Sequence, residues 1–154
     1  MLRPLLHGDK GSIALEFCLI SPFLIALFIG IFDMGFLLFQ QMQVEAAAGA
    51  GAFYVAAKGP GAFDATKTAN VVAAAAYPTQ TAIVGNASWT CGCPNGTSGV
   101  TNVGGTPPNC GGSCANGFTP GVYVRVTANA IPTPIFRWPG YPGQVKSGVV
   151  LRIK

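Results

Sequence analysis

The sequence predicts an α+β protein: a long N-terminal transmembrane helix that continues out of the membrane, a short second helix, and a small antiparallel sheet of about three strands with a disulfide-bearing loop. Three observations predict this architecture. Apolar residues fill almost all of 17–39, apolar and polar residues alternate over 122–129 and 149–154, and four of the five cysteines gather between residues 91 and 114. A span of that length is typical of a membrane helix, and alternation is typical of a half-buried strand.

The composition argues against an enzyme. Hydrophobic residues make up 50% of the 154 residues and charged residues only 9%, whereas charged residues make up about 25% of soluble domains. The chain has one histidine, His7, and the segment 65–154 contains no Asp, Glu or His. General acid–base catalysis usually depends on one of these side chains, so we expect no enzyme and no cofactor. The Lys and Arg residues of the same segment do not cluster, so we also expect no nucleic-acid partner.

The apolar segment 17–39 is long enough to cross a bilayer. As a helix its 23 residues would span about 34 Å, more than the hydrocarbon core of about 30 Å. It is also longer than the apolar core of a secretory signal peptide, which is usually about 7–15 residues. Arg3 and Lys10 precede the segment, and the next basic residue is Lys58. Because positive charge stays in the cytoplasm, we expect a single pass with a cytoplasmic N-terminus and an exported remainder.

The helix is expected to run beyond the membrane, from about residue 12 to 57. Good helix formers follow the apolar span, and 59–61 reads Gly-Pro-Gly, which is a strong stop. Pro22 lies inside this helix and predicts a kink. The Ala- and Gly-rich stretch 46–52 has no bulky side chains, so another helix can approach its backbone closely. A plain Ala-rich helix with incidental glycines explains the stretch equally well.

The exported part combines one helix with short strands. A second helix is expected over about 63–77, with Asp64 as its N-cap. Strand patterns occupy 81–91, 122–129 and 149–154, and the long segments between them, 92–121 and 131–144, are expected to be loops. The second loop carries four prolines together with Phe136, Arg137, Trp138 and Tyr141. Its aromatic side chains would form an exposed patch or pack the loop onto the sheet, and we expect the packing.

The cysteines fall into two groups. Cys18 lies in the apolar span, where we expect it to be buried and inert. The other four, Cys91, Cys93, Cys110 and Cys114, lie in the exported part, where thiols oxidise, so two disulfides are expected. A Cys91–Cys93 bond would be strained, so each of these two is expected to pair with Cys110 or Cys114 across the loop, in either order. A zinc site of four thiolates is the alternative, but oxidation would come first, so no metal is expected.

The start of the apolar helix carries the most specific signal. A basic tail precedes Gly11, and Glu16 follows five residues later, where the apolar span begins. This arrangement resembles the leader-cleavage signal of type IV pilin-like precursors. Over about 11–59 the chain resembles the TadE-like family of tight-adherence (Tad) pilus proteins, through the pattern Gly11-x-x-Ala14-x-Glu16-Phe17-x-Leu19-x-x-Pro22 and then Asp33-Met34-Gly35.

The resemblance implies how the chain is processed. In this family a prepilin-type aspartic peptidase cuts after the glycine, here Gly11, so the mature chain would begin at Ser12 with Glu16 as its fifth residue. The implied divisions of the chain are a basic leader at 1–11, a membrane-spanning and extended helix at 12–60, and an exported α+β domain at 61–154. The implied processing and assembly motif comprises Glu16, Phe17, Pro22 and Asp33.

The resemblance also implies a function. Such proteins are minor pilins or pseudopilins, which help to build a Tad-type IV pilus by helix–helix assembly after leader cleavage. The expected location is the bacterial inner membrane, with the C-terminal domain in the periplasm, or the pilus itself. The expected partners are the peptidase, other pilus subunits, the inner-membrane secretion platform and membrane lipid. The competing hypothesis is an uncleaved single-pass anchor whose disulfide-stapled exported domain binds an envelope partner.

Two acidic residues of the motif have two interpretations each. An acid in a lipid-facing helix is costly and is a functional candidate by default. Glu16 would pair with the new amine of Ser12, within one chain or between neighbours, or it would be solvated at the headgroup interface. Asp33 lies near the outer end of the span, where it would be exposed at the outer leaflet or would contact another subunit.

Overall fold

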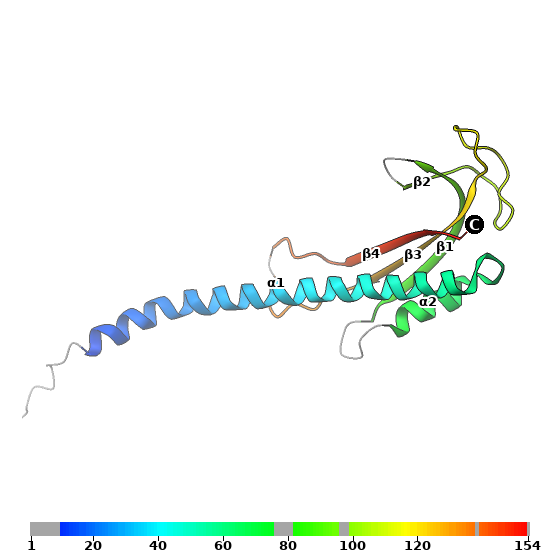
Figure 1. Cartoon of the computed structure of the whole chain (residues 1–154). Helices are drawn as coiled ribbons and strands as arrows, with labels where there is room; N and C mark the ends of the chain where they lie inside the picture. The colour runs from blue at the N-terminus through cyan, green and yellow to red at the C-terminus, as the bar shows by residue number, and fades with distance from the viewer. Residues whose placement is uncertain (1–9, 76–81, 96–98, 138, 154) are drawn as a thin grey trace, which may run out of the picture.

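The computed structural model describes residues 10–75, 82–95, 99–137 and 139–153. One long helix, α1 (Lys10–Lys58), runs through the whole molecule (Figure 1). Its N-terminal half projects alone, and its C-terminal half lies against a four-stranded sheet together with a short helix, α2 (Ala65–Ala74). The predicted α+β fold with a long N-terminal helix is therefore confirmed.

The ends of α1 lie within two residues of those expected from the sequence. The helix continues through Pro22, which does not end it. It stops before Gly59, whose φ of 74° is readily adopted only by glycine, and a single 3₁₀ turn, Pro60–Ala62, follows. The Gly-Pro-Gly sequence thus ends the helix by the backbone geometry that these residue types favour.

Asp64 caps α2 as predicted. Its Oδ1 accepts a hydrogen bond from the backbone N–H of Lys67 at 3.0 Å, and its Oδ2 lies 3.4 Å from the Lys67 ammonium. Because the donated N–H favours the charged form, it holds the pKa of the Asp64 carboxyl below its usual value. The helix ends at Ala74, and the last two residues of the expected range, 76 and 77, lie outside the described residues.

The sheet is antiparallel, with the strand order β2-β1-β3-β4. The strands are β1 (Val84–Asn95), β2 (Gly99–Asn102), β3 (Gly121–Ala130) and β4 (Val145–Arg152). The sequence predicted about three strands and placed β2 in a loop. This strand reads Gly-Val-Thr-Asn, which is too short and too polar to show an alternating pattern, and it forms because it pairs with the end of β1.

One face of the sheet forms the core against the two helices. The central strand β3 contributes four buried side chains to this core, Val124, Val126, Ala128 and Ala130. The buried residues of α1 that belong to the same core are Val44, Ala47, Ala48 and Val55, and α2 adds Val72. Burial of apolar side chains on one side of each element is what fixes α1 on the sheet.

The glycines of the Ala- and Gly-rich stretch are not equivalent. A Cβ at Gly51 would lie 2.5 Å from Cγ2 of Val72 and 2.9 Å from Cγ1 of Val126, both of which are buried side chains. A Cβ at Gly49 would meet no atom within 4 Å. The close approach predicted from the small residues therefore occurs at Gly51, and the approaching helix is α2 of the same chain.

This difference predicts opposite effects for two matched substitutions. Gly51→Ala should lower the free energy of unfolding by about 1–3 kcal/mol, because the branched Val72 and Val126 side chains cannot move away within a packed core. Gly49→Ala should leave stability unchanged or raise it by up to about 1 kcal/mol, because alanine favours a helix more than glycine does. Thermal unfolding of both variants in detergent measures this, and equal effects would contradict the assignment of α2 to the Gly51 face.

Candidate functional site

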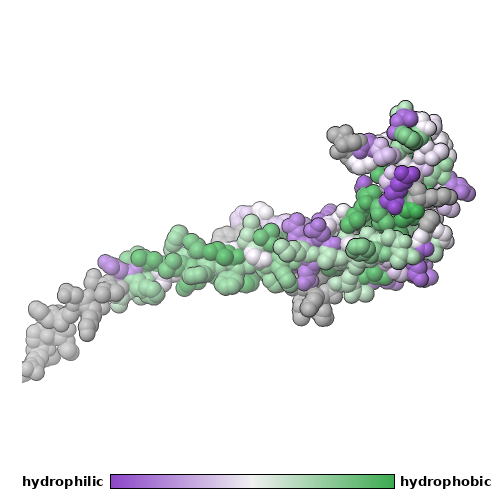
Figure 2. Space-filling view, viewed as in Figure 1, coloured by the Kyte–Doolittle hydropathy of each residue, from purple (hydrophilic) through white to green (hydrophobic). Residues whose placement is uncertain are grey.

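The projecting part of α1 exposes a long, largely apolar surface. We call residues 14–32 the free segment. Its most exposed large side chains are Leu15, Phe17, Leu19, Phe23 and Phe32, and Figure 2 shows the apolar colour along this half of the helix. The free segment is about 28 Å long as a helix, close to the hydrocarbon thickness of about 30 Å. By length and composition α1 can cross a membrane, and no residue in the most apolar stretch of this helix is buried.

The face of α1 that packs against the rest of the chain, which we call the docked face, begins at Asp33. Buried or half-buried residues recur from there at helical spacing, at Asp33, Leu37, Gln40, Val44 and Ala47. Spacings of three and four residues place these side chains on one face of the helix, which is the face turned towards the sheet and α2. The same helix therefore changes its surroundings at Asp33, from an exposed apolar surface to a protein interface.

Asp33 itself is held by two backbone amides. Its Oδ1 accepts a hydrogen bond from the N–H of Ile135 at 2.8 Å, and its Oδ2 accepts one from the N–H of Phe136 at 2.9 Å. The residue is only 2% exposed. Hydrogen bonds to a charged acceptor are stronger than neutral ones, and they are what makes a buried carboxylate tolerable. The interpretation of Asp33 as exposed at the outer leaflet is therefore wrong, because a loop of the same chain buries it; the contact with another subunit stays a prediction.

That loop, residues 131–144, connects β3 to β4 and reaches along α1 towards the free segment (Figure 1). We call it the proline loop. Tyr141 of this loop is half-buried near Asp33, and burial, with a smaller effect from the Asp33 charge, raises the pKa of its hydroxyl. Ile135 and Phe136 turn their side chains outwards. The expected packing of the loop aromatics onto the sheet is thus wrong for Phe136, and Trp138 lies outside the described residues.

The residues of the predicted cleavage motif lie at the far end of the free segment. α1 begins at Lys10, so the helix includes Gly11 and Ser12, although the side chains of 10–13 are outside the described ones. Glu16 is exposed, as are Phe17 and Pro22. Glu16 and Asp33 are 17 residues apart on one helix, or about 26 Å. The structure therefore separates the four motif residues along α1 and does not gather them into one site.

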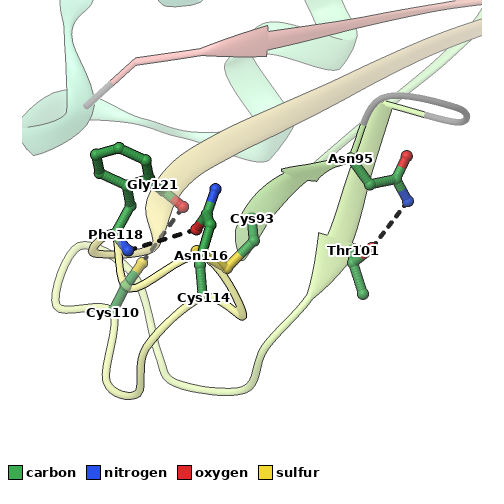
Figure 3. The surroundings of a disulfide bond; sticks show 8 residues. All are labelled: Cys93, Asn95, Thr101, Cys110, Cys114, Asn116, Phe118 and Gly121. Carbon is green, nitrogen blue, oxygen red and sulfur yellow. Dashed lines mark hydrogen bonds between the residues drawn. A yellow bond between two sulfur atoms is a disulfide. The ribbon is translucent and has the colours of Figure 1, made fainter.

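The disulfides lie at the other end of the molecule. Cys91 is bonded to Cys110 and Cys93 to Cys114, with Cα–Cα distances of 5.4 Å and 5.6 Å. Both bonds tie the long loop before β3 to β1, and Figure 3 shows the second bond beside this loop. Among the described residues, no group of three or more His, Cys, Asp or Glu side chains is placed to hold a metal.

The fifth cysteine does not lie where it was expected. Cys18 is exposed on the free segment and is not buried within the chain. Its neighbours Phe17 and Leu19 are 65% and 75% exposed, so the whole helix surface around Cys18 lacks a covering protein element. The prediction of burial followed from the apolar character of the segment, which also suits a helix that faces lipid rather than protein.

Comparison with protein families identifies one part of the chain. Residues 11–52 match the family described as TadE-like protein. This segment resembles TadE-like proteins, and we call it the TadE-like segment. Comparison of the chain with curated proteins and with solved structures found no match.

The TadE-like segment covers about a quarter of the chain, and it confirms the family resemblance over 11–52 rather than over the full 11–59. It includes the cleavage motif, the whole free segment and the docked face as far as Ala52. Asp33 belongs to it, whereas its partners Ile135 and Phe136 do not. No local pattern in the sequence indicates this contact, because it joins residues more than a hundred positions apart.

Replacement of Asp33 within the TadE-like segment should loosen the proline loop. In Asp33→Asn one of the two acceptor oxygens becomes an NH₂ group, which cannot accept the amide hydrogen facing it. Leaving one buried donor unpaired should cost about 1–3 kcal/mol. Hydrogen exchange of the Ile135 and Phe136 amides should become faster. Glu45→Gln, which neutralises an exposed acid on the same helix, is the matched control, and unchanged exchange in Asp33→Asn would contradict the contact.

The disulfide pairing predicts a simple labelling pattern. A thiol reagent applied to the unreduced, denatured protein should modify Cys18 alone, and the Cys18→Ser variant should not be labelled. Each disulfide should add roughly 2–4 kcal/mol to the stability of the exported domain. Recovery of all five thiols, or of one zinc ion per chain, would show that the bonds do not form in the cell.

Proposed function

We propose that this chain is a Tad-type pilus assembly subunit, a minor pilin or pseudopilin, anchored in a bacterial inner membrane. The match of residues 11–52 to the TadE-like family carries the proposal. The structure supports it with an exposed apolar free segment of membrane length, followed by a folded domain. In this arrangement the N-terminus is cytoplasmic and the sheet with its disulfides lies in the periplasm, where disulfides persist.

The proposed maturation removes residues 1–11. A prepilin-type aspartic peptidase would cut between Gly11 and Ser12, which leaves the helix of 12–60 and the exported domain of 61–154. The cut falls close to the N-terminal end of α1, which begins at Lys10. The cut therefore lies far along α1 from the core, whose first buried member on this helix is Val44.

The mature protein would act through assembly and not through catalysis. Ser12 and Glu16 are four residues apart, which places them on one side of the helix, so the new amine at Ser12 can reach the Glu16 carboxylate of its own chain or a neighbour. Pairing would neutralise two charges in an apolar layer. Other pilus subunits and the inner-membrane secretion platform would pack against the free segment, which the chain itself leaves exposed.

Cleavage after Gly11 is tested by the mass of the native protein. We expect the mature chain to start at Ser12, and Gly11→Leu should leave the precursor intact because a bulky residue replaces the glycine at the scissile bond. Gly35→Leu is the matched control, since it makes the same change in an open position of the same helix and should not affect cleavage. If the native protein retains residues 1–11, the uncleaved single-pass anchor with a disulfide-stapled binding domain is the better explanation.

Glu16 should be needed for assembly and not for folding. Glu16→Ala should leave the amount of membrane-inserted protein and the thermal stability of the exported domain unchanged, because Glu16 lies far along α1 from every core residue. Pilus formation should be lost, since an unpaired Ser12 amine would remain in the packed apolar layer. Glu45→Ala removes an exposed acid from the docked half of α1 and serves as the control. Normal pili in Glu16→Ala would show that the carboxylate is only an interfacial residue.

A further inference from the structure

The proline loop meets α1 within its exposed apolar surface and not beyond it. The loop binds Asp33, whose neighbours along the helix, Phe32 and Met34, are 67% and 60% exposed. Exposed apolar side chains continue for two further turns, at Phe36, Leu38, Phe39 and Met42. The loop therefore lies at a level of the helix that still presents apolar side chains to its surroundings.

The loop adds its own apolar side chains at that level. Ile135 is 75% exposed and Phe136 is 53% exposed, and these are the two residues whose amides bind Asp33. Their position next to exposed apolar residues of α1 makes the two surfaces continuous. Arg137 follows directly and is exposed, so a cation lies beside the apolar pair. This combination of apolar, aromatic and basic side chains is typical of the boundary between membrane and water.

The backbone of the loop is suited to the edge of an apolar layer. Non-helical backbone at membrane depth is tolerated only when its N–H groups find partners. The Asp33 carboxylate supplies partners for Ile135 and Phe136, and the two nearby prolines, Pro132 and Pro134, have no N–H to satisfy. The contact thus lowers the cost of placing this segment against lipid, because these two N–H groups are paired and the two prolines have none to pair.

The depth of the contact agrees with the thickness of a bilayer. With Glu16 at the inner boundary, Asp33 lies about 26 Å further along the helix, near the outer edge of a hydrocarbon core of about 30 Å. Aromatic side chains are enriched at this level in membrane proteins.

We propose that the proline loop is a membrane-interface anchor: Ile135 and Phe136 insert into the outer boundary of the bilayer beside α1, and Asp33 holds the loop at that depth. This inference rests on the proposed placement of the free segment in the membrane. Its consequence is that the exported domain contacts lipid at two points, the helix and the loop, so it cannot tilt freely about the end of the helix.

Spin-label accessibility in lipid nanodiscs tests the proposal on the full-length chain. In a Cys18→Ser background, without reductant, a nitroxide is attached singly at Phe136→Cys or Ile135→Cys. Ile25→Cys in the free segment, 57% exposed, is the lipid reference, and Phe53→Cys near the far end of α1, 79% exposed, is the aqueous reference. The measured quantity is collision with oxygen, which concentrates in lipid, relative to collision with a water-soluble nickel chelate.

The labels at 135 and 136 should give an oxygen-to-nickel ratio several-fold above that at 53 and closer to that at 25. Adding Asp33→Asn should lower the ratio at 135 and 136 towards the aqueous value, whereas Glu45→Gln should not. If position 25 is lipid-exposed but 135 and 136 match position 53, the loop anchor is wrong and the membrane helix stands. If position 25 is itself aqueous, the membrane placement fails, and the loop anchor fails with it.

Discussion

The packing of one face of α1 against the sheet is the contact on which the rest of the structure depends. β3, β4 and α2 all pack on this helix, and the buried side chains of the core come from α1, from α2 and from the sheet with Ile83 just before β1. The helix is also the element with a surface of membrane length. One helix thus combines an exposed apolar surface of membrane length in its first half with protein packing in its second half.

Side-chain size separates the two halves. The free segment is rich in Phe, Leu and Ile, which suit a lipid environment and leave large apolar surfaces exposed in the single chain. The docked half carries Ala47, Ala48 and Gly51, which let α2 and β3 approach the backbone. The helix backbone then makes close van der Waals contacts with α2 and β3, and these contacts fill the space that a large side chain would otherwise occupy. Asp33 lies at the boundary, and its buried carboxylate is satisfied by the chain itself.

The sequence predicted best what depends on neighbouring residues. The Asp64 cap, the stop at Gly59 and the alternation in β3 are local features, and each was placed within one or two residues. The strand β2 was missed because its four residues acquire their structure from pairing with β1. The partner of Asp33 was missed because the contact joins positions far apart in the chain, and the outward turn of Phe136 follows from that contact. The disulfide pairs agree with the expected bonds across the loop, whose order the spacing alone left open.

The continuity of α1 has a geometric consequence for any assembly built around it. Because no break separates Glu16 from the docked face, the direction in which the sheet points around the helix axis is fixed relative to the carboxylate. Each residue of an α-helix advances the azimuth by about 100° and the height by about 1.5 Å. The number of residues between Glu16 and Asp33 therefore sets the angle at which the sheet is held around the helix axis relative to Glu16, and a single insertion between them would rotate the sheet by about 100°.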